Sequence, residues 1–179
     1  GRNGKNANSA VIVTVSPEDF PEKGILGGLA FQRQLEDAAF AEGQGKIPVQ
    51  LFGDFKKNVP SSSAGTIAPQ MKGTYSWSNV RSIFPEFIAK SLEEGITEFG
   101  KKIPGYDRDD AVLSGVESRT SSPVRILRDE TLQSSVKGLY PCGEGAGYAG
   151  GITSAAMDGL KVAEAVSQKY MAFDNPKNV

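Results

Sequence analysis

Short apolar runs and one helical pattern mark the beginning of the chain. The run "SAVIVTV" (residues 9–15) is rich in β-branched residues and predicts a buried strand. Apolar positions at helical spacing predict a helix over residues 26–40, with Gly43 as its C-terminal stop. "PVQLF" (48–52) predicts a second short strand. Residues 58–79 carry Ser, Gly and Pro without a period, which predicts a long loop.

The clearest helical pattern follows this loop. Its apolar positions share one face of a helix and are Phe84, Phe87, Ile88, Leu92, Ile96 and Phe99. Pro85 suits the first turn of such a helix, and "KKIPG" ends it. This stripe is typical of a core-facing helix, or of a surface that packs on other segments or on a second copy in a homodimer.

The last part of the chain predicts short strands and then a helix. Residues 111–120, 123–128 and 138–142 have the β-branched or apolar runs of strands. A terminal helix is predicted from about Gly151 to Tyr170. Its expected packing face consists of Ile152, Ala156, Leu160, Ala163 and Val166.

This order of elements predicts an α/β fold, which would be classed as α+β if strands and helices segregate. A loose division falls near residues 104–110. It separates a cap-like region, residues 1–106, from a ligand-facing region, residues 107–179.

The composition of the chain limits the kinds of molecule that it is expected to bind. Apolar residues make up 39% and charged residues 23%, as in ordinary globular proteins. A net charge of −1 gives no general attraction to nucleic acid or anionic membranes. No apolar run approaches the roughly 20 residues that a membrane helix needs. We therefore expect neither a nucleic-acid nor a membrane partner.

The absence of histidine and the presence of only one cysteine limit the catalytic and metal-binding chemistry that the chain can perform. The chain has no histidine, which excludes a Ser-His-Asp triad and a histidine-ligated zinc site within it. Its one cysteine, Cys142, excludes an internal disulfide, so a reducing, cytoplasmic location is the expectation. Cys142 itself is interpreted as a small buried residue. "DRDD" (107–110) departs from the calcium-loop pattern, so no metal site is predicted, and no catalytic acid or base can be named.

A glycine-rich turn lies between the last predicted strand and the terminal helix. Gly145, Gly147 and Gly150 spell G-x-G-x-x-G there, and Glu144 lies at the carboxyl end of the strand. A helix N-terminus offers unpaired N–H groups and a partial positive charge, and glycines let a ligand approach them. A Rossmann turn needs a second parallel strand after the helix, which is not predicted here. The Glu144 carboxylate could instead accept hydrogen bonds from sugar or polyol hydroxyls.

The segment "VKGLYPCGEGAGYAGGITSAAMDGLKVAEAV" resembles the closing segment of FAD-dependent oxidoreductases with two dinucleotide-binding domains, the glutathione-reductase-like superfamily. The longer string "GVESRTSSPVRILRDETLQSSVKGLYPCGEGAGYAGGITSAA" resembles bacterial FAD-dependent, NAD/FAD-utilising dehydrogenases. The resemblance implies a C-terminal fragment of a longer flavoprotein with an inserted cap. The N-terminal Rossmann part would then be its partner, and the isolated fragment would be inactive and would not hold FAD stoichiometrically.

The resemblance also implies roles for individual residues. Glu144 would bind a ribityl hydroxyl of FAD, and the backbone of Gly151 and Ile152 would face the N1/C2-carbonyl edge of the flavin ring. The remaining implied FAD contacts are Gly145, Gly147 and Gly150, which allow close approach, and Tyr148, which packs at the ring's edge. NAD(P)H is the implied co-substrate.

The stretch "SRTSSPVR" (118–125) precedes this segment. Its polar residues are Arg119, Thr120, Ser121, Ser122 and Arg125. They could contact an anionic substrate or a nicotinamide dinucleotide, since arginine supplies forked donors, or they could form a solvated hairpin. Two other functions stay open for the chain: a nucleotide- or phosphate-binding module without redox chemistry, and a non-catalytic interaction domain.

Overall fold

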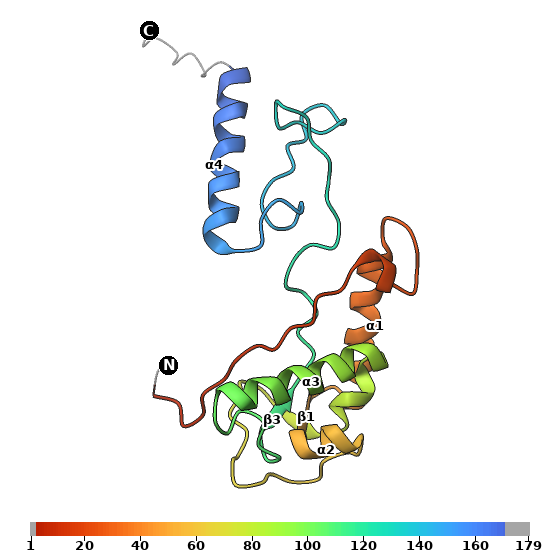
Figure 1. Ribbon diagram of the computed structural model, residues 1–179. Helices are drawn as coiled ribbons and strands as arrows, with labels where there is room; N and C mark the ends of the chain where they lie inside the picture. The colour runs from red at the N-terminus through yellow and green to blue at the C-terminus, as the bar shows by residue number, and fades with distance from the viewer. Residues whose placement is uncertain (1–2, 171–179) are drawn as a thin grey trace. The chain divides into compact units, whose positions relative to one another are not determined.

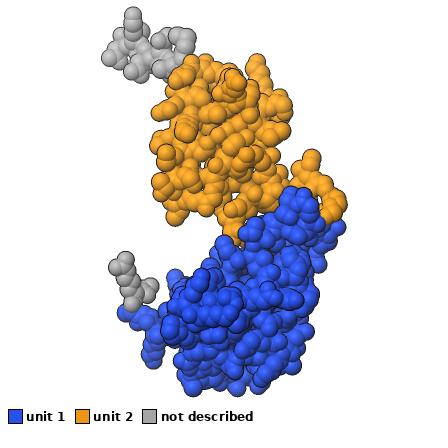
Figure 2. Space-filling view, in the orientation of Figure 1, with its two compact units in different colours: residues 1–21, 30–118 blue, residues 22–29, 119–179 orange. Residues whose placement is uncertain are grey.

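The computed structural model describes residues 3–170 (Figure 1), which form a small mixed α/β protein. The chain divides into two compact units (Figure 2). Unit 1 consists of residues 1–21 and 30–118, and unit 2 of residues 22–29 and 119–179, each described only within residues 3–170. None of the helices in the described part combines the length and apolar character that crossing a bilayer requires.

Unit 1 contains a three-stranded mixed sheet in the order β2-β1-β3. Its strands are β1 (Ile47–Leu51), β2 (Tyr75–Trp77) and β3 (Val112–Ser114). The central strand β1 runs parallel to β2 and antiparallel to β3, with Val49 opposite both Trp77 and Ser114. The predicted strand at residues 48–52 is therefore confirmed, but the predicted loop 58–79 is wrong where it contains β2.

Three helices and two 3-10 turns accompany this sheet. They are α1 (Gly27–Glu42), α2 (Phe52–Lys57), α3 (Glu86–Lys102), η1 (Pro17–Asp19) and η2 (Val80–Ile83). The buried core joins α1, α2, η2 and α3 through Ala39, Phe52, Phe55, Val80, Ile83, Ala89 and Ile96. A second cluster joins α1 to α3 through Phe31, Leu35 and Ile88. The predicted helices at 26–40 and 84–99 are confirmed, while α2 was not predicted.

The end of α1 shows why Gly43 stops it. A Cβ at Gly43 would lie 2.0 Å from the Lys46 carbonyl oxygen, so only glycine fits there. Gln44 and Gly45 then adopt left-handed backbone angles, with φ of 52° and 76°, and turn the chain into β1.

The predicted strand over residues 9–15 is wrong. This stretch is extended, but within the described residues it pairs with no strand. Val11, Val13 and Val15 pack against the two apolar clusters of unit 1, while Ile12 remains 75% exposed. Alternation of buried and exposed positions gave the segment its strand-like pattern, although helices rather than a neighbouring strand cover its apolar side.

Polar residues also lie inside unit 1. The fully buried Gln50 side chain donates to the Val59 carbonyl (2.7 Å) and to Asn79 Oδ1 (3.0 Å). It accepts from the Arg81 N–H (3.0 Å), so each of its polar atoms is bonded. The buried Arg81 guanidinium in turn pairs with Glu93 at 2.6 Å.

Among the described residues of unit 2, α4 (Ile152–Lys169) is the one complete helix, and the first three residues of α1 also belong to this unit. From residue 119 to residue 151 the chain forms turns and bends without a strand. The predicted strands at 123–128 and 138–142 are therefore wrong, and the one at 111–120 shortens to β3. A strand requires a neighbour that pairs with its N–H and C=O groups, and the described part of unit 2 supplies none.

The predicted terminal helix is confirmed, but its predicted packing face is wrong at every position except Val166, which is half-buried. Ile152 and Leu160 are 93% and 66% exposed, whereas Val162 is buried and Asp158 is half-buried. The covered side of α4 consists of Ala155, Asp158, Gly159, Val162, Ala165 and Val166. The helix is turned this way because Asp158 pairs with Arg128, a polar contact that an apolar pattern does not reveal.

Candidate functional site

The glycine-rich turn that precedes α4 closes on itself through backbone hydrogen bonds. The Gly147 N–H donates to the Glu144 carbonyl (2.9 Å), and the Tyr148 N–H donates to the Gly143 carbonyl (3.0 Å). Gly143 and Gly147 have positive φ angles of 71° and 82°. A Cβ at Gly147 would lie 2.7 Å from the Val124 carbonyl oxygen. The turn therefore needs glycine at position 147 for its own geometry.

Glu144 lies exposed on this turn. Within residues 3–170 its carboxylate has no hydrogen-bond or ion-pair partner. An exposed, unpaired carboxylate on a turn that is otherwise fixed can accept hydrogen bonds from a ligand's hydroxyl groups.

The start of α4 is open. Gly151 is its N-cap residue, with extended angles (φ −159°, ψ 162°) and no capping side chain. Ser154 Oγ donates back to the Gly151 carbonyl (3.0 Å), and Ile152 is 93% exposed. The unpaired N–H groups and partial positive charge of the first turn are thus not satisfied by a capping side chain.

An ion pair between Arg128 and Asp158 connects the glycine-rich turn to α4. Arg128 Nη2 lies 2.7 Å from Asp158 Oδ1, and their side chains are only 10% and 12% exposed. Asp158 Oδ2 also accepts from Arg128 Nη1 (3.0 Å) and from the Gly143 N–H (2.9 Å). Arg128 Nη1 donates further to the Pro141 carbonyl (2.8 Å). The pair therefore ties α4 to the first residue of the turn.

This arrangement shifts the pKa values of both Asp158 and Arg128. The Arg128 guanidinium, helped by the Gly143 N–H, lowers the pKa of Asp158 to about 2. The Asp158 carboxylate raises the pKa of Arg128. Both groups consequently keep their charges at every pH near neutrality.

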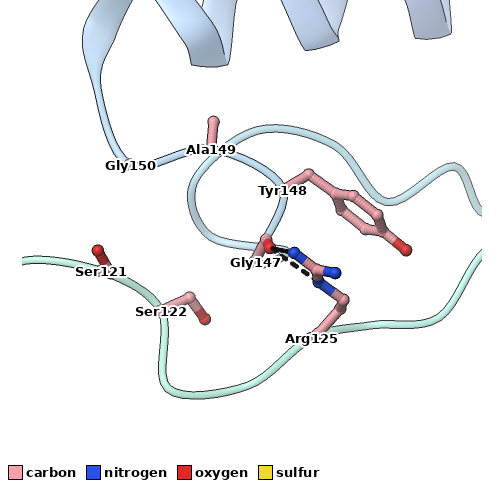
Figure 3. Close-up of a pocket in the computed structure, with 7 residues that line it drawn as sticks. All are labelled: Ser121, Ser122, Arg125, Gly147, Tyr148, Ala149 and Gly150. Atoms are coloured by element: carbon pink, nitrogen blue, oxygen red, sulfur yellow. Dashed lines mark hydrogen bonds between the residues drawn. The ribbon is translucent and has the colours of Figure 1, made fainter. Parts of the chain in front are cut away.

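Two guanidinium groups lie over the Tyr148 ring. Arg128 lies 3.6 Å from the ring centroid and Arg125 lies 4.9 Å from it. The Tyr148 hydroxyl donates to the Ile126 carbonyl (3.1 Å). Arg125 donates to the Gly147 carbonyl through Nε (3.0 Å) and Nη2 (2.8 Å), as Figure 3 shows.

An open recess of about 300 Å³ lies beside this arginine (Figure 3). It is lined by Ser121, Ser122, Arg125, Gly147, Tyr148, Ala149 and Gly150. The recess thus joins part of the predicted substrate-contact stretch to part of the predicted cofactor turn, both within unit 2.

The other predicted site residues lie outside the recess. They are Glu144, Gly145, Gly151, Ile152, Arg119 and Thr120. Glu144 and Gly145 belong to the same turn, and Gly151 and Ile152 begin α4. Arg119 and Thr120 are exposed.

Sequence reasoning missed the Arg128–Asp158 pair. Asp158 interrupts the apolar pattern of α4 and Arg128 ends the apolar run 123–128, but nothing in the sequence joins these two positions, which lie 30 residues apart. The interpretation of Cys142 as buried is wrong, because its side chain is exposed. The buried residue at that point of the chain is its neighbour Pro141.

Comparisons with known proteins place the chain in a family. Residues 1–120 match the family described as "FAD-dependent protein, C-terminal domain-like", and the chain belongs to this family. A protein of Clostridium beijerinckii (strain ATCC 51743 / NCIMB 8052), described as an uncharacterized protein, is 51% identical over 175 residues. That alignment covers 96% of this chain and 32% of the relative, so the chain spans about a third of the relative's length.

Proposed function

We propose that this chain supplies one wall of the flavin site of an FAD-dependent oxidoreductase. One observation carries the proposal: the unpaired Glu144 carboxylate lies on a turn that is closed by backbone hydrogen bonds and leads to the start of α4, which no side chain caps. Membership of a family described as FAD-dependent supports the use of flavin by the parent protein, while the matched residues 1–120 end before the turn.

The residues present fit the cofactor. Gly145 has no atom within 4 Å of where a Cβ would lie, and Gly150 has only Ser121 Oγ, at 3.5 Å. A flat ring can therefore approach the backbone of the turn. When bound, FAD would supply the redox chemistry, accepting a hydride from NAD(P)H and exchanging electrons with an organic substrate.

In this proposal, the residues of the chain bind FAD and orient its ring. Glu144 accepts hydrogen bonds from the ribityl hydroxyls, which fixes the polyol chain beside the turn. The N–H groups at Gly151 and Ile152 face the N1/C2-carbonyl edge of the ring and stabilise negative charge there, by up to about 2 kcal/mol in a partly buried site. Tyr148, whose ring contacts the guanidinium groups of Arg125 and Arg128, borders one side of the space for the flavin ring.

The rest of a longer polypeptide would complete the site. In the described part of unit 2, the buried residues with an apolar side chain are only Pro141, Ala146 and Val162. Ile152, Met157 and Leu160 of α4 are 93%, 56% and 66% exposed. So much exposed apolar surface on a small unit is typical of an interface. We propose that the rest of a longer parent polypeptide covers this surface, since the Clostridium beijerinckii relative is about three times as long as this chain.

A phosphate- or nucleotide-binding module without redox chemistry is the second candidate, favoured by the serines and arginine of the recess. The two can be separated in the full-length protein. Purified under anaerobic conditions, it should show the visible absorbance of oxidised flavin, and NADH or NADPH should bleach it. A colourless protein that takes up no added FAD would support the second candidate.

A further inference from the structure

The two arginines beside Tyr148 are not in equivalent electrostatic environments. Asp158 neutralises Arg128 at 2.7 Å. Arg125 has no carboxylate partner among residues 3–170; its contacts there are the Gly147 carbonyl and the Tyr148 ring. One of two neighbouring guanidinium groups therefore carries an unneutralised charge.

Arg125 is nevertheless held in place. Both its Nε and its Nη2 point to the Gly147 carbonyl, at 3.0 and 2.8 Å (Figure 3), and its guanidinium lies over the Tyr148 ring. Nη1 has no partner within the described residues. A surface arginine whose charge served solubility alone would not need these contacts, whereas an arginine that receives an anion gains from being ordered in advance.

Further donors surround the same recess. The Ser121 hydroxyl has no partner in the described part of the chain, unlike Ser122, whose hydroxyl donates to the Val124 carbonyl (2.8 Å). The backbone N–H groups of Ala149 and Gly150 have no acceptor within residues 3–170. Ser121 Oγ would lie 3.5 Å from a Cβ at Gly150, so the absence of a side chain keeps the space beside the hydroxyl open.

We propose that this recess binds an oxyanion, the carboxylate or phosphate group of a ligand of the parent enzyme. Arg125 supplies the charge, and Ser121 and the Ala149–Gly150 backbone supply hydrogen bonds. The inference rests on the proposed function, since it gives the class of molecule that would reach the flavin from this side. The volume of about 300 Å³ suits an anionic head group with a short organic stem.

The test is a titration of the ¹⁵N-labelled chain, without flavin, followed by NMR at constant ionic strength. Inorganic phosphate and acetate are the two probes, and chloride is the ionic-strength control. We expect saturable shifts confined to the Ala149 and Gly150 amides and the Arg125 Nε–H. Tighter binding of phosphate would indicate a nucleotide source, and tighter binding of acetate a carboxylate substrate; either outcome supports an oxyanion site.

Three variants control the experiment. Arg125→Gln should weaken binding at least about tenfold, because it removes a charged donor. Ser121→Ala, which breaks no contact in the described structure, should weaken binding about three- to tenfold. Lys137→Gln removes an exposed charge of the same unit and should change nothing.

The inference is overturned if neither probe saturates, or if Arg125→Gln binds both probes as the unsubstituted chain does while its amide spectrum shows an intact fold. Because no flavin is present, this failure is distinct from failure of the proposed function. A full-length protein that lacks flavin while the chain still binds phosphate would contradict the flavin wall alone.

Discussion

Arg128 and Asp158 join two distant parts of unit 2 through a two-point ion pair, with nitrogen-to-oxygen distances of 2.7 and 3.0 Å. Because Asp158 also accepts from the Gly143 N–H at 2.9 Å, the pair fixes where the glycine-rich turn begins relative to α4. The position of Glu144 on that turn therefore depends on two residues that need not touch any ligand.

Breaking this pair should destabilise unit 2. Arg128→Gln leaves the Asp158 carboxylate, whose side chain is only 12% exposed, without its cation, and such losses cost about 3 to 5 kcal/mol. The measurement is urea unfolding followed by the amide signals of α4. Arg33→Gln, which removes an exposed arginine of unit 1, should leave those signals unchanged. An equal effect of the two substitutions would contradict the bracing role.

The same pair predicts an acid dependence. The folded pKa of Asp158, about 2, lies below its unfolded value of about 4, so its stabilisation is complete above the unfolded pKa and disappears as the pH falls through the folded pKa. The unfolding free energies of the unsubstituted chain and of Asp158→Asn should therefore converge between about pH 4 and pH 2. A difference that stays constant across this range would show that the Asp158 charge contributes nothing.

Substitution by alanine should destabilise the turn at Gly147 but not at Gly145. Gly147 has a φ of 82°, and a Cβ there would lie 2.7 Å from a backbone oxygen that cannot move aside freely. Gly147→Ala should lower the unfolding free energy of unit 2 by about 1 to 3 kcal/mol. Gly145→Ala, where a Cβ meets nothing within 4 Å, should be close to neutral in the isolated chain. Thermal unfolding by circular dichroism compares the two, and equal losses would contradict the geometry of the turn.

Local periodicity made the helices predictable, whereas pairing across the chain did not. The stripe over residues 84–99 corresponds to α3, because helical neighbours lie close in sequence. The runs 9–15 and 123–128 have strand-like composition but lack a partner strand in the described structure. Whether a run becomes a strand depends on non-local neighbours, which composition does not specify.

For the candidate site, the sequence predicted the local backbone to a similar extent. The glycine spacing predicted a turn before the terminal helix, and the structure has a turn there that leads to the start of α4, which no side chain caps. That Glu144 and this turn face a ligand stays a prediction. The ion pair behind the turn joins residues 30 positions apart, so sequence spacing could not reveal it. The apolar pattern also predicted most of the packing face of α4 wrongly, because the half-buried Asp158, which pairs with Arg128, lies on the covered side of the helix.

The stability of unit 1 should be sensitive to substitution of Gln50. Gln50→Leu would leave the Val59 carbonyl, the Asn79 amide oxygen and the Arg81 N–H without their partner in a dry environment. The expected loss is about 2 to 4 kcal/mol in the unfolding free energy, measured by denaturation with the fluorescence of Trp77. Gln34→Leu on the exposed side of α1 is the matched control. A loss below that of the control would mean that water replaces the missing bonds.

The most direct test of the flavin wall is the FAD affinity of the full-length protein with and without the Glu144 carboxylate. Glu144→Gln keeps the shape of the side chain but removes its charge, and should weaken FAD binding by about ten- to a hundredfold, because one carboxylate acceptor is lost and the other hydrogen bond to the ribityl hydroxyls becomes a weaker, neutral one. Glu130→Gln, a second exposed glutamate of unit 2, should bind FAD as tightly as the unsubstituted protein. Fluorescence titration of the apoprotein with FAD measures all three, and equal affinities for all three proteins would contradict the account.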